Sequence, residues 1–269
     1  MLTLVTETRK AAAWIEYSAP NPGAATRLFC FPYAGGSASI YRPWNGAPLE
    51  QVEVCPIQIP GRENRIGERP FTDLRSLSKA VADVIPLDKP FALFGHSVGG
   101  LLCFEVAREL RRRGAAVPFH LFVSASSAPH LCPNRPLRFN LTREQLLAEI
   151  RKLGGTPEDV LEDRELLDLI LPAIRADFSL FDTYYYRDEE PFDFPVTALT
   201  GNADLEVDSL ETLQWHIQTN DKFRHYQFPG NHFFLHASSR DVRVLIAKEM
   251  ESTAPVGPNS ADKYLSKTI

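Results

Sequence analysis

A serine between two glycines is the residue in this sequence best placed to do chemistry. Residues 95–99 read Gly-His-Ser-Val-Gly, which puts Ser97 in the pattern G-x-S-x-G. The pattern is typical of a sharp turn from a strand into a helix, where a Cβ two positions either side of the serine would strike neighbouring backbone. Such a turn lifts the serine hydroxyl above a sheet and exposes it as a nucleophile. The alternative is an ordinary turn in which Ser97 only caps the helix that follows.

The residues around Ser97 match the strand and helix that this turn requires. Residues 91–94 are apolar and suit a buried parallel strand. After the turn, apolar residues recur at helical spacing from Leu101 to Leu110, and three arginines and Gly114 follow. Cations and a glycine are expected where a helix ends, so we interpret the arginines as a helix terminus rather than a binding patch.

Two later residues could activate the Ser97 hydroxyl. Asp204 follows a strand predicted at residues 196–200, and His232 follows the last predicted strand through a Pro-Gly-Asn turn. An imidazole can take the serine proton, and a buried carboxylate can fix the imidazole tautomer and stabilise its cation. The order Ser, Asp, His is that of the α/β-hydrolases. We therefore expect Ser97 to attack, His232 to act as base and then acid, and Asp204 to orient His232.

Other aspartates and histidines are placed less well for these roles. Asp193 precedes its strand, and Asp208 suits the first turn of a helix. His225 falls inside a predicted strand and His236 inside a predicted helix, where packing or exposure explains them.

A glycine-rich loop follows the first buried strand. Residues 27–31 are followed by Pro32 and then Tyr33-Ala34-Gly35-Gly36-Ser37. In hydrolases of this architecture, one oxyanion donor is the amide after the nucleophile and the other comes from such a loop. We therefore expect the amides of Ala34 and Val98 to form the oxyanion hole.

The hydrophobic pattern predicts an α/β fold of the α/β-hydrolase type, with a mostly parallel central sheet, helices on both faces and a helical lid insertion. Residues 1–128 and 192–250 form the predicted core, and residues 251–269 a flexible tail. Strands are expected at residues 27–31, 52–59, 91–94, 121–125, 196–200 and 223–228, with an edge strand at 14–17. Further helices are expected at residues 72–85, capped by Thr72, and at 209–218 and 233–250.

The strand pattern lapses between residues 129 and 191. Helices are predicted at residues 142–153 and 164–181, joined by Gly154-Gly155-Thr156-Pro157. A long insert after a strand can form a lid with a mobile Gly-Gly joint, or it can simply extend the core. Tyr33, Phe178, Phe181 and Tyr185 are candidates to bind an acyl chain, although aromatic stripes more often serve packing.

Composition excludes several classes of function. The chain has 269 residues, 44% of them hydrophobic, and a formal net charge of −5. The acidic balance disfavours nucleic-acid binding, and no apolar run approaches the roughly 20 residues of a membrane helix. The start of the chain lacks a secretory pattern, and the four cysteines lie far apart without metal-ligand spacing. We expect a cytoplasmic monomer without a metal, a cofactor or a membrane partner.

Five motifs together resemble the type II thioesterases of polyketide and nonribosomal peptide pathways. They are FPYAGGSA at 31–38, PGRENRIGERPFTDL at 60–74, GHSVGG at 95–100, TGNAD at 200–204 and PGNHFFL at 229–235. The resemblance implies hydrolysis of acyl thioesters from the phosphopantetheine arm of acyl or peptidyl carrier proteins, which clears stalled or mis-primed synthases. It also implies a helical lid, matched here by residues 129–191. The chain departs from the family at Val98, where methionine is common, and at Asn202, where aspartate is common.

Three arginines could steer a carrier protein, because carrier proteins are usually acidic. Arg62, Arg65 and Arg69 lie in one charged loop, but they could equally be ordinary solvated side chains. Charge reversal at Arg62 and Arg65 is predicted to slow turnover of carrier-bound substrate but not of a small thioester. Three alternatives to the thioesterase interpretation remain at this stage: a carboxylesterase or lipase on the same triad, an acyltransferase, and a binding module without catalysis.

Overall fold

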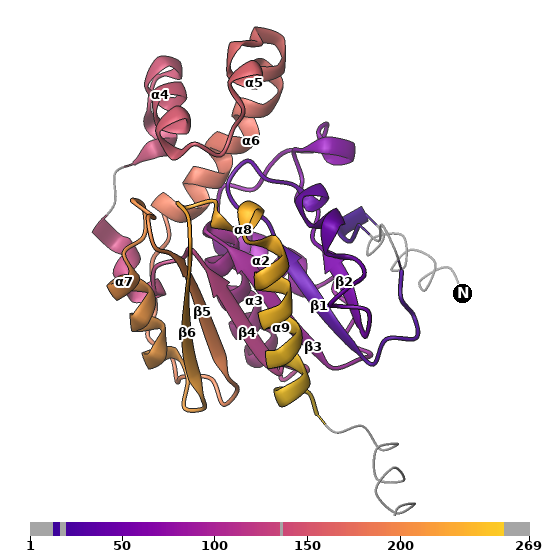
Figure 1. The fold of residues 1–269 in the computed structure, drawn as a ribbon. Coiled ribbons are helices and arrows are strands. Elements are labelled where there is room, and N and C mark those ends of the chain that lie inside the picture. Colours follow the sequence, from indigo (N-terminus) through magenta and orange to yellow (C-terminus); the bar gives the residue numbers. More distant parts are fainter. Residues whose placement is uncertain (1–12, 17–19, 135–136, 256–269) are drawn as a thin grey trace, which may run out of the picture.

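The computed structural model describes residues 13–16, 20–134 and 137–255. Its centre is a sheet of six parallel strands in the order β2-β1-β3-β4-β5-β6 (Figure 1). The strands are β1 (Thr26–Phe31), β2 (Val52–Pro56), β3 (Phe91–His96), β4 (His120–Ser124), β5 (Val196–Gly201) and β6 (Phe223–Phe228). The predicted parallel α/β sheet is confirmed. Because β1 and β3 are neighbours, the loop after β1 and the turn after β3 leave the sheet side by side.

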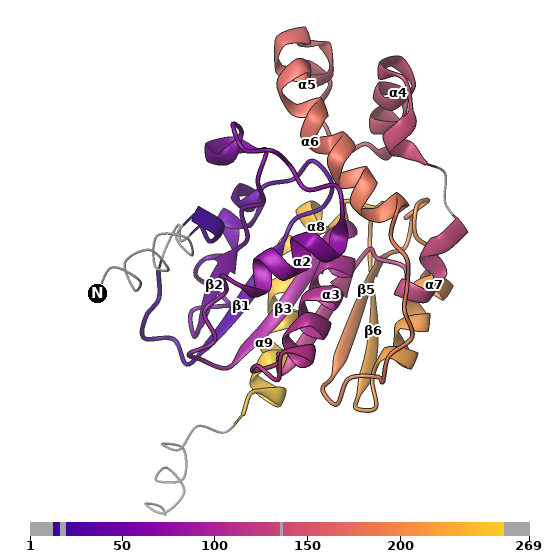
Figure 2. The ribbon, with the colours of Figure 1, turned by 180° about the vertical axis from the view of Figure 1, so that it is seen from behind.

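Side chains alternate between the two faces of the sheet, and each face has its own apolar core. Phe29 and Leu93 belong to the core under α2 (Leu74–Ala82) and α3 (Val98–Arg112), which are in the foreground of Figure 2. Leu28 and Phe94 belong to the opposite core, under the 3-10 helix η1 (Ala38–Trp44) and α9 (Ser239–Thr253), the latter in the foreground of Figure 1. Burial on both faces explains why the central strands read as continuous apolar runs.

Residues 129–191, here called the helical insert, connect β4 to β5. Its helices are η3 (Pro129–Asn134), η4 (Arg138–Asn140), α4 (Arg143–Leu153), α5 (Glu158–Glu162) and α6 (Arg164–Asp182). Helices α4 and α5 rise beyond the carboxyl ends of the strands (Figures 1 and 2). Leu146, Leu161 and Phe178 belong to a separate apolar cluster that α4, α5 and α6 share. The insert therefore has a small core of its own.

The helix boundaries follow local capping chemistry. Helix α4 begins with a capping box between Thr142 and Gln145 and ends at Gly154, which has φ 73°. Helix α2 is capped by Asp73, whose carboxylate accepts a hydrogen bond from the Ser76 amide, so the predicted cap at Thr72 was one residue early. Carboxylate and hydroxyl caps are close in strength, and sequence alone did not separate these neighbours.

Three other predicted elements differ in the structure. The edge strand at 14–17 is reduced to one antiparallel bridge between Ile15 and Ile57, and Tyr17 lies outside the described residues. The helix at 209–218 is α7 (Ser209–Leu213) followed by the 3-10 helix η5 (Gln214–Gln218). The helix at 233–250 is broken at Ser238 into α8 (Phe234–Ala237) and α9, which continues to Thr253. The rest of the predicted tail, from residue 256, is outside the described part of the chain.

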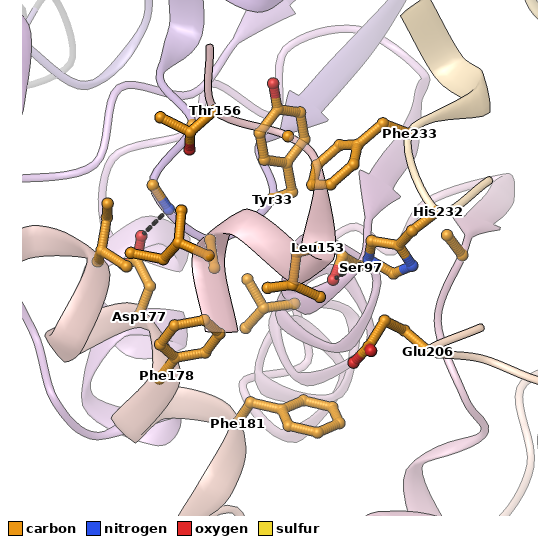
Figure 3. Close-up of a pocket in the computed structure, with 18 of the residues that line it drawn as sticks. Tyr33, Ser97, Leu153, Thr156, Asp177, Phe178, Phe181, Glu206, His232 and Phe233 are labelled. Atoms are coloured by element: carbon orange, nitrogen blue, oxygen red, sulfur yellow. Dashed lines mark hydrogen bonds between the residues drawn. The ribbon is translucent and has the colours of Figure 1, made fainter. Parts of the chain in front are cut away.

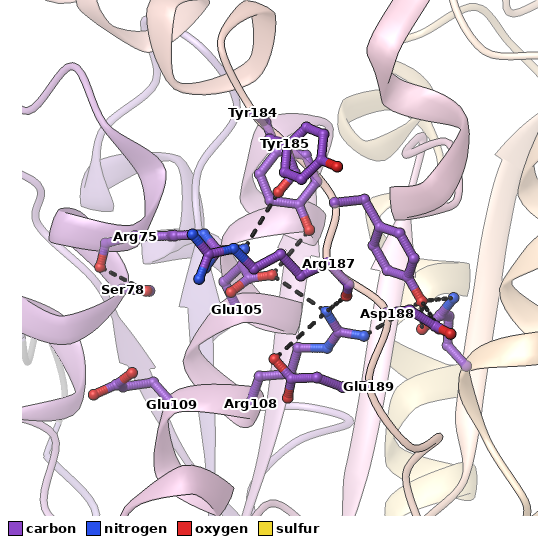
Figure 4. A network of polar contacts seen from close by, with 12 residues as sticks. Arg75, Ser78, Glu105, Arg108, Glu109, Tyr184, Tyr185, Arg187, Asp188 and Glu189 are labelled. Atoms are coloured by element: carbon purple, nitrogen blue, oxygen red, sulfur yellow. Dashed lines mark hydrogen bonds and ion pairs between the residues drawn. The ribbon is translucent and has the colours of Figure 1, made fainter.

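Residues 184–189, the return segment, fasten the end of the insert to α3 (Figure 4). The Tyr184 hydroxyl donates to Glu105 Oε1 at 2.9 Å, and Arg108 Nη1 donates to the Arg187 carbonyl at 2.7 Å. Glu105 and Arg108 are buried, and the Arg108 guanidinium lies 4.2 Å from the centre of the Phe104 ring. A buried charge is tolerated only when it is paired, so these contacts fix the return segment in one place.

No helix within the described ranges is long and apolar enough to cross a bilayer.

Candidate active site

The turn at Ser97 has the strained geometry that its glycines predict. Ser97 has φ 56° and ψ −123°, a conformation that typically costs on the order of 1–3 kcal/mol. A Cβ on Gly95 would lie 2.0 Å from the Gly99 carbonyl oxygen, and one on Gly99 would lie 2.4 Å from the Phe31 carbonyl oxygen. Both glycines are therefore required by close backbone packing, and the turn presents Ser97 at the carboxyl edge of the sheet.

Ser97, His232 and Asp204 form one chain of hydrogen bonds. The Ser97 hydroxyl lies 3.0 Å from His232 Nε2, and His232 Nδ1 lies 2.9 Å from Asp204 Oδ2. With a neutral imidazole, Nδ1–H donates to the carboxylate and Nε2 accepts from the hydroxyl. The structure thus brings together three side chains that the sequence places on the loops after β3, β5 and β6. The rivals lie elsewhere: His225 pairs with Thr200, and Asp208 caps α7.

The Asp204 carboxylate is held in its charged form. Its side chain is fully buried, and burial is the largest single effect and opposes ionisation, but the hydrogen bond and charge of His232 together with two backbone amides outweigh it. The other carboxylate oxygen accepts from the amides of Glu206 at 2.8 Å and Val207 at 3.1 Å. Together these contacts hold the pKa of Asp204 below its ordinary value.

His96 fixes the loop that carries His232, a role that the sequence did not suggest. Its Nε2 lies 2.8 Å from the His232 carbonyl, so Nε2–H donates there, and Nδ1 then accepts from the Ser124 hydroxyl at 2.9 Å. Burial lowers the pKa of His96 to about 3, so the ring stays neutral near pH 7 and keeps this tautomer. The residue before Ser97 therefore positions the backbone of His232.

The two expected oxyanion donors line the same cavity as Ser97. Val98 is the first residue of α3. Amides in the first turn of a helix have no acceptor within the helix, and they form the positive end of the helix dipole. Ala34 comes from the loop after β1, which is next to β3 in the sheet. This placement is compatible with the predicted role of both amides.

A cavity of about 290 Å³ opens beside Ser97 and His232 and is lined mainly by apolar side chains (Figure 3). Phe178 and Phe181 contribute to its wall from α6, and Tyr33 contributes from the loop after β1. The Tyr33 hydroxyl lies 2.9 Å from His236 Nε2. Further apolar lining residues are Ile40, Ile150, Leu153, Val160, Ile170, Ile174, Val207 and Phe233.

Tyr185 does not line this cavity, so its prediction as a substrate-binding residue was wrong. It is 71% exposed, and its carbonyl accepts a hydrogen bond from Arg75 (Figure 4). Helix α6 ends at Asp182, and the return segment then runs without helical structure. Its inward tyrosine is Tyr184, which turns toward Glu105 rather than toward the cavity.

Residues 26–250 match the family described as Thioesterase domain. The chain belongs to the thioesterase family. This thioesterase is 40% identical over 252 residues to the gramicidin S biosynthesis protein GrsT of Aneurinibacillus migulanus, covering 93% of this chain and 97% of GrsT. It also resembles the solved structure of the RedJ thioesterase from the prodiginine pathway of Streptomyces coelicolor, with TM-score 0.81 and 39% identity over 87% of this chain and 94% of RedJ.

A second similar solved structure is that of a type II thioesterase. The type II thioesterase BorB from the borrelidin biosynthetic cluster has TM-score 0.79 and 37% identity, covering 88% of this thioesterase and 97% of BorB. The predicted resemblance to type II thioesterases is confirmed, and the family supports a thioester hydrolase.

The charged side chains around the cavity of the thioesterase are paired with one another. Arg138 from η4 pairs with Glu206 and, at 2.9 Å, with Glu149 of α4. Burial opposes ionisation of Glu206, but the hydrogen bond from Arg138 and the neighbouring positive charges hold its pKa below the ordinary value. These residues were missed in the sequence because partners as distant as 138 and 206 carry no local signal.

The predicted steering role of Arg62 and Arg65 was wrong, because both are 6% exposed. Arg62 forms two hydrogen bonds of 2.8 Å with Asp177 of α6. Arg65 donates to Glu68 and to the Gln58 carbonyl and stacks on Trp14. Two of the three arginines in the charged sequence 61–70 therefore point inward, and Arg69 is the member of the three that stays exposed.

Gly154 and Gly155 of the thioesterase have different structural reasons to be glycines. Gly154 ends α4 with φ 73°, and the nearest atom to a Cβ there would be Asn231 Nδ2 at 4.0 Å. A Cβ on Gly155 would lie 2.2 Å from Cζ of Phe233, the residue after His232. The second glycine therefore lets the helical insert approach the loop that carries His232.

Proposed function

We propose that this protein is a serine thioesterase that removes acyl groups from the phosphopantetheine arm of acyl or peptidyl carrier proteins. It would thereby clear stalled or mis-primed polyketide and nonribosomal peptide synthases. The observation that carries the proposal is the hydrogen-bonded chain of Ser97, His232 and Asp204 beside an apolar cavity. The similarity to GrsT, RedJ and BorB supports a substrate held within such pathways. A cytoplasmic monomer remains part of the proposal.

In the acylation step, His232 Nε2 takes the proton of Ser97 while Oγ bonds to the thioester carbonyl carbon. The oxyanion that forms accepts hydrogen bonds from the amides of Ala34 and Val98. The carbon–sulfur bond then breaks, and the proton on His232 passes to the departing sulfur. The products are the free carrier thiol and an acyl ester on Ser97. Asp204 stabilises the imidazolium that exists between the two proton transfers.

Water completes the reaction by the same route. His232 takes a proton from water while the water oxygen attacks the ester carbonyl carbon. His232 then gives this proton to Ser97 Oγ as the bond between Oγ and the acyl carbon breaks and the carboxylic acid leaves. Removing one oxyanion donor from sites of this kind lowers turnover by about 10² to 10³.

The apolar cavity suits the acyl chain, and the helical insert supplies much of its wall. Phe178 and Phe181 come from α6, and Leu153 and Ile150 from α4. Since charged lining residues are paired, the cavity favours uncharged chains. In this proposal the insert acts as the lid, and its movement admits the acyl chain.

The deciding experiment is mass spectrometry of acylated carrier proteins incubated with wild type, Ser97→Ala and Ser78→Ala. Ser78 is a buried serine of α2 whose hydroxyl bonds the Arg75 carbonyl, and it serves as the matched control. Wild type and Ser78→Ala should release the acyl group, whereas folded Ser97→Ala should not. Undiminished release by Ser97→Ala would refute the assignment.

A parallel assay separates the alternatives. Rates on acyl-phosphopantetheine and on p-nitrophenyl esters of the same acyl chain should favour the thioester. A clear preference for the ester would indicate a carboxylesterase instead. Failure of a fluorophosphonate to label Ser97 in the folded protein would indicate a binding module, and formation of an acylated hydroxyl or amine acceptor would indicate a transferase.

A further inference from the structure

A buried ion pair joins the helical insert to the loop that carries the Ala34 amide. Arg62 and Asp177 are connected by two hydrogen bonds of 2.8 Å, and their side chains are 7% and 2% exposed. Asp177 Oδ2 also accepts from the Gly35 amide at 2.7 Å (Figure 3), and Arg62 Nη1 also donates to the Gly36 carbonyl at 2.9 Å. The ion pair therefore binds the loop at two successive residues, through the amide of Gly35 and the carbonyl of Gly36.

The hydrogen bond from the Gly35 amide to Asp177 fixes the peptide group next to the proposed oxyanion donor, the Ala34 amide. The Gly35 amide belongs to the Ala34–Gly35 peptide, so its bond to Asp177 fixes the orientation of that peptide and the backbone angle of Ala34. Gly35 has φ +76°, and a Cβ there would lie 2.9 Å from Ile174 of α6. Helix α6 therefore touches the loop at this point through both a polar and an apolar contact.

The far end of the same loop is held by other side chains. The Ser37 hydroxyl donates to Glu63 at 2.7 Å, and the Ala38 amide donates to the side chain of Gln58 at 2.8 Å. Loss of the ion pair would therefore release residues 34–36 while leaving the start of η1 in place. This arrangement separates an effect on oxyanion geometry from an effect on folding.

We propose that Arg62 and Asp177 are positioning residues that hold the Ala34 amide in the oxyanion hole. The inference rests on the proposed hydrolytic function and adds to it that α6 is part of the support for catalysis. Buried ion pairs contribute little net stability compared with apolar packing, whereas they fix geometry by several directed bonds at once. A lid helix that supplies one of these partners couples the position of the insert to the quality of the oxyanion hole.

The test compares Asp177→Asn and Arg62→Lys with Arg65→Lys. Arg65 is the matched control because it lies in the same loop with the same exposure, but it bonds Glu68 and Gln58 instead of the Ala34 loop. Asp177→Asn should lower kcat about 10- to 100-fold, less than the loss of a whole oxyanion donor, with KM changed less than about threefold. Arg65→Lys should leave kcat within about twofold.

Inhibitor affinities supply a readout that a purely structural role would not move. An alkyl boronic acid, which forms a tetrahedral adduct on Ser97, should bind Asp177→Asn and Arg62→Lys more weakly by about the same factor as the loss in kcat. A non-hydrolysable acyl-pantetheine thioether should bind all variants alike. If Asp177→Asn does not fold, Arg62→Lys, which keeps the charge but loses the bidentate geometry, carries the test.

Two results would overturn the inference. One is a kcat within twofold of wild type for both pair variants, and the other is an equal loss of affinity for the boronic acid and the thioether. Ser97→Ala in the same assays separates this failure from failure of the proposed function. An inactive Ser97→Ala beside fully active pair variants refutes only the positioning role, whereas an active Ser97→Ala refutes the hydrolytic mechanism as well.

Discussion

The sheet core and the helical insert are held by different forces. In the core, central strands such as β3 and β4 are completely buried, and fully burying a side chain such as Leu93 stabilises the fold by about 1.5–3 kcal/mol. The insert has a small apolar cluster, but several of its links to the core are polar, such as those of Asp177 and Arg138. The difference indicates that core substitutions should mainly change stability, whereas substitutions at the boundary should mainly change activity.

The largest effect is expected from Gly95→Ala, which tests the core side of this comparison. The added Cβ would lie 2.0 Å from a backbone oxygen that cannot move away. We expect a loss of more than about 4 kcal/mol in the free energy of unfolding, measured by urea denaturation. Gly67→Ala, where a Cβ would meet nothing within 4 Å, is the control and should be near neutral. Equal stability of both variants would contradict the packing argument.

Asp204→Asn should cost activity with little cost in stability. The amide keeps the size of the side chain, but its hydrogen bond would favour the wrong tautomer of His232, so kcat should fall roughly 10⁴-fold. The measurement is carrier-protein deacylation together with thermal unfolding. A neighbouring control, Asp208→Asn, changes the cap of α7 and should retain activity. Activity of Asp204→Asn near that of wild type would remove Asp204 from the site.

The paired glycines of the insert sharpen the comparison further. Gly155→Ala would push the insert away from Phe233, and we expect kcat/KM to fall about 10-fold with the free energy of unfolding changed by less than about 1 kcal/mol. Gly154→Ala would instead strain a left-handed cap and should cost about 1 kcal/mol of stability while activity is retained. If kcat/KM is the same for the two variants, the contact between the insert and the loop that carries His232 does not contribute to activity.

Acid should weaken the core through a buried histidine far from the insert. His120 has its pKa lowered by burial to about 4, whereas an unfolded chain binds this proton near pH 6.5. The unfolded state therefore holds more protons between these values, and stability contributed by neutral His120 is lost as pH falls from about 6.5 to 4, by at most about 1.4 kcal/mol per pH unit. His120→Gln should flatten the dependence of unfolding free energy on pH. An unchanged slope in His120→Gln would contradict the assignment.

The smallest effect is expected from Arg69→Glu. Arg69 is the exposed arginine of the loop at 61–70, and a carrier protein of acidic character would be repelled by the new charge. We expect kcat/KM for carrier-bound substrate to fall about threefold at low salt, with no change for a small thioester. Lys248→Glu on α9 is the matched control. Equal loss on both substrates would show that Arg69 does not steer the carrier.

The sequence predicted the core better than the boundary, for a physical reason. The central strands β3 and β4 follow from short apolar runs, and the Ser97 turn follows from glycines that backbone packing demands. The contact of Asp177 with Arg62 joins residues 115 positions apart, and no local pattern marks it. The same limit explains the error at Arg65, since a charged stretch is normally exposed and only the fold reveals buried partners.

The three consecutive tyrosines at 184–186 show that sequence alone does not predict which single side chain faces inward. Tyr184, Tyr185 and Tyr186 are chemically identical neighbours, and which of them faces inward depends on where α6 ends. The prediction that Phe178 and Phe181 bind an acyl chain depended on an aromatic stripe, and both residues line the cavity. The end of this helix was predicted to within one residue, but no local pattern marks which tyrosine faces inward in the non-helical segment that follows, and the prediction for Tyr185 was wrong.

The fastening of residues 184–189 to α3 has a consequence for diversification. The end of the insert is fastened to α3, and Asp177 of α6 is fastened to the glycine-rich loop, while α4 and α5 contribute apolar side chains to the cavity wall. Exchange of α4 and α5 among relatives, with Gly155 kept beside Phe233, would then change which acyl chains fit the cavity. Chimeras with one junction before α4 and the other in α6 between Pro172 and Asp177 would use that division to engineer new selectivity.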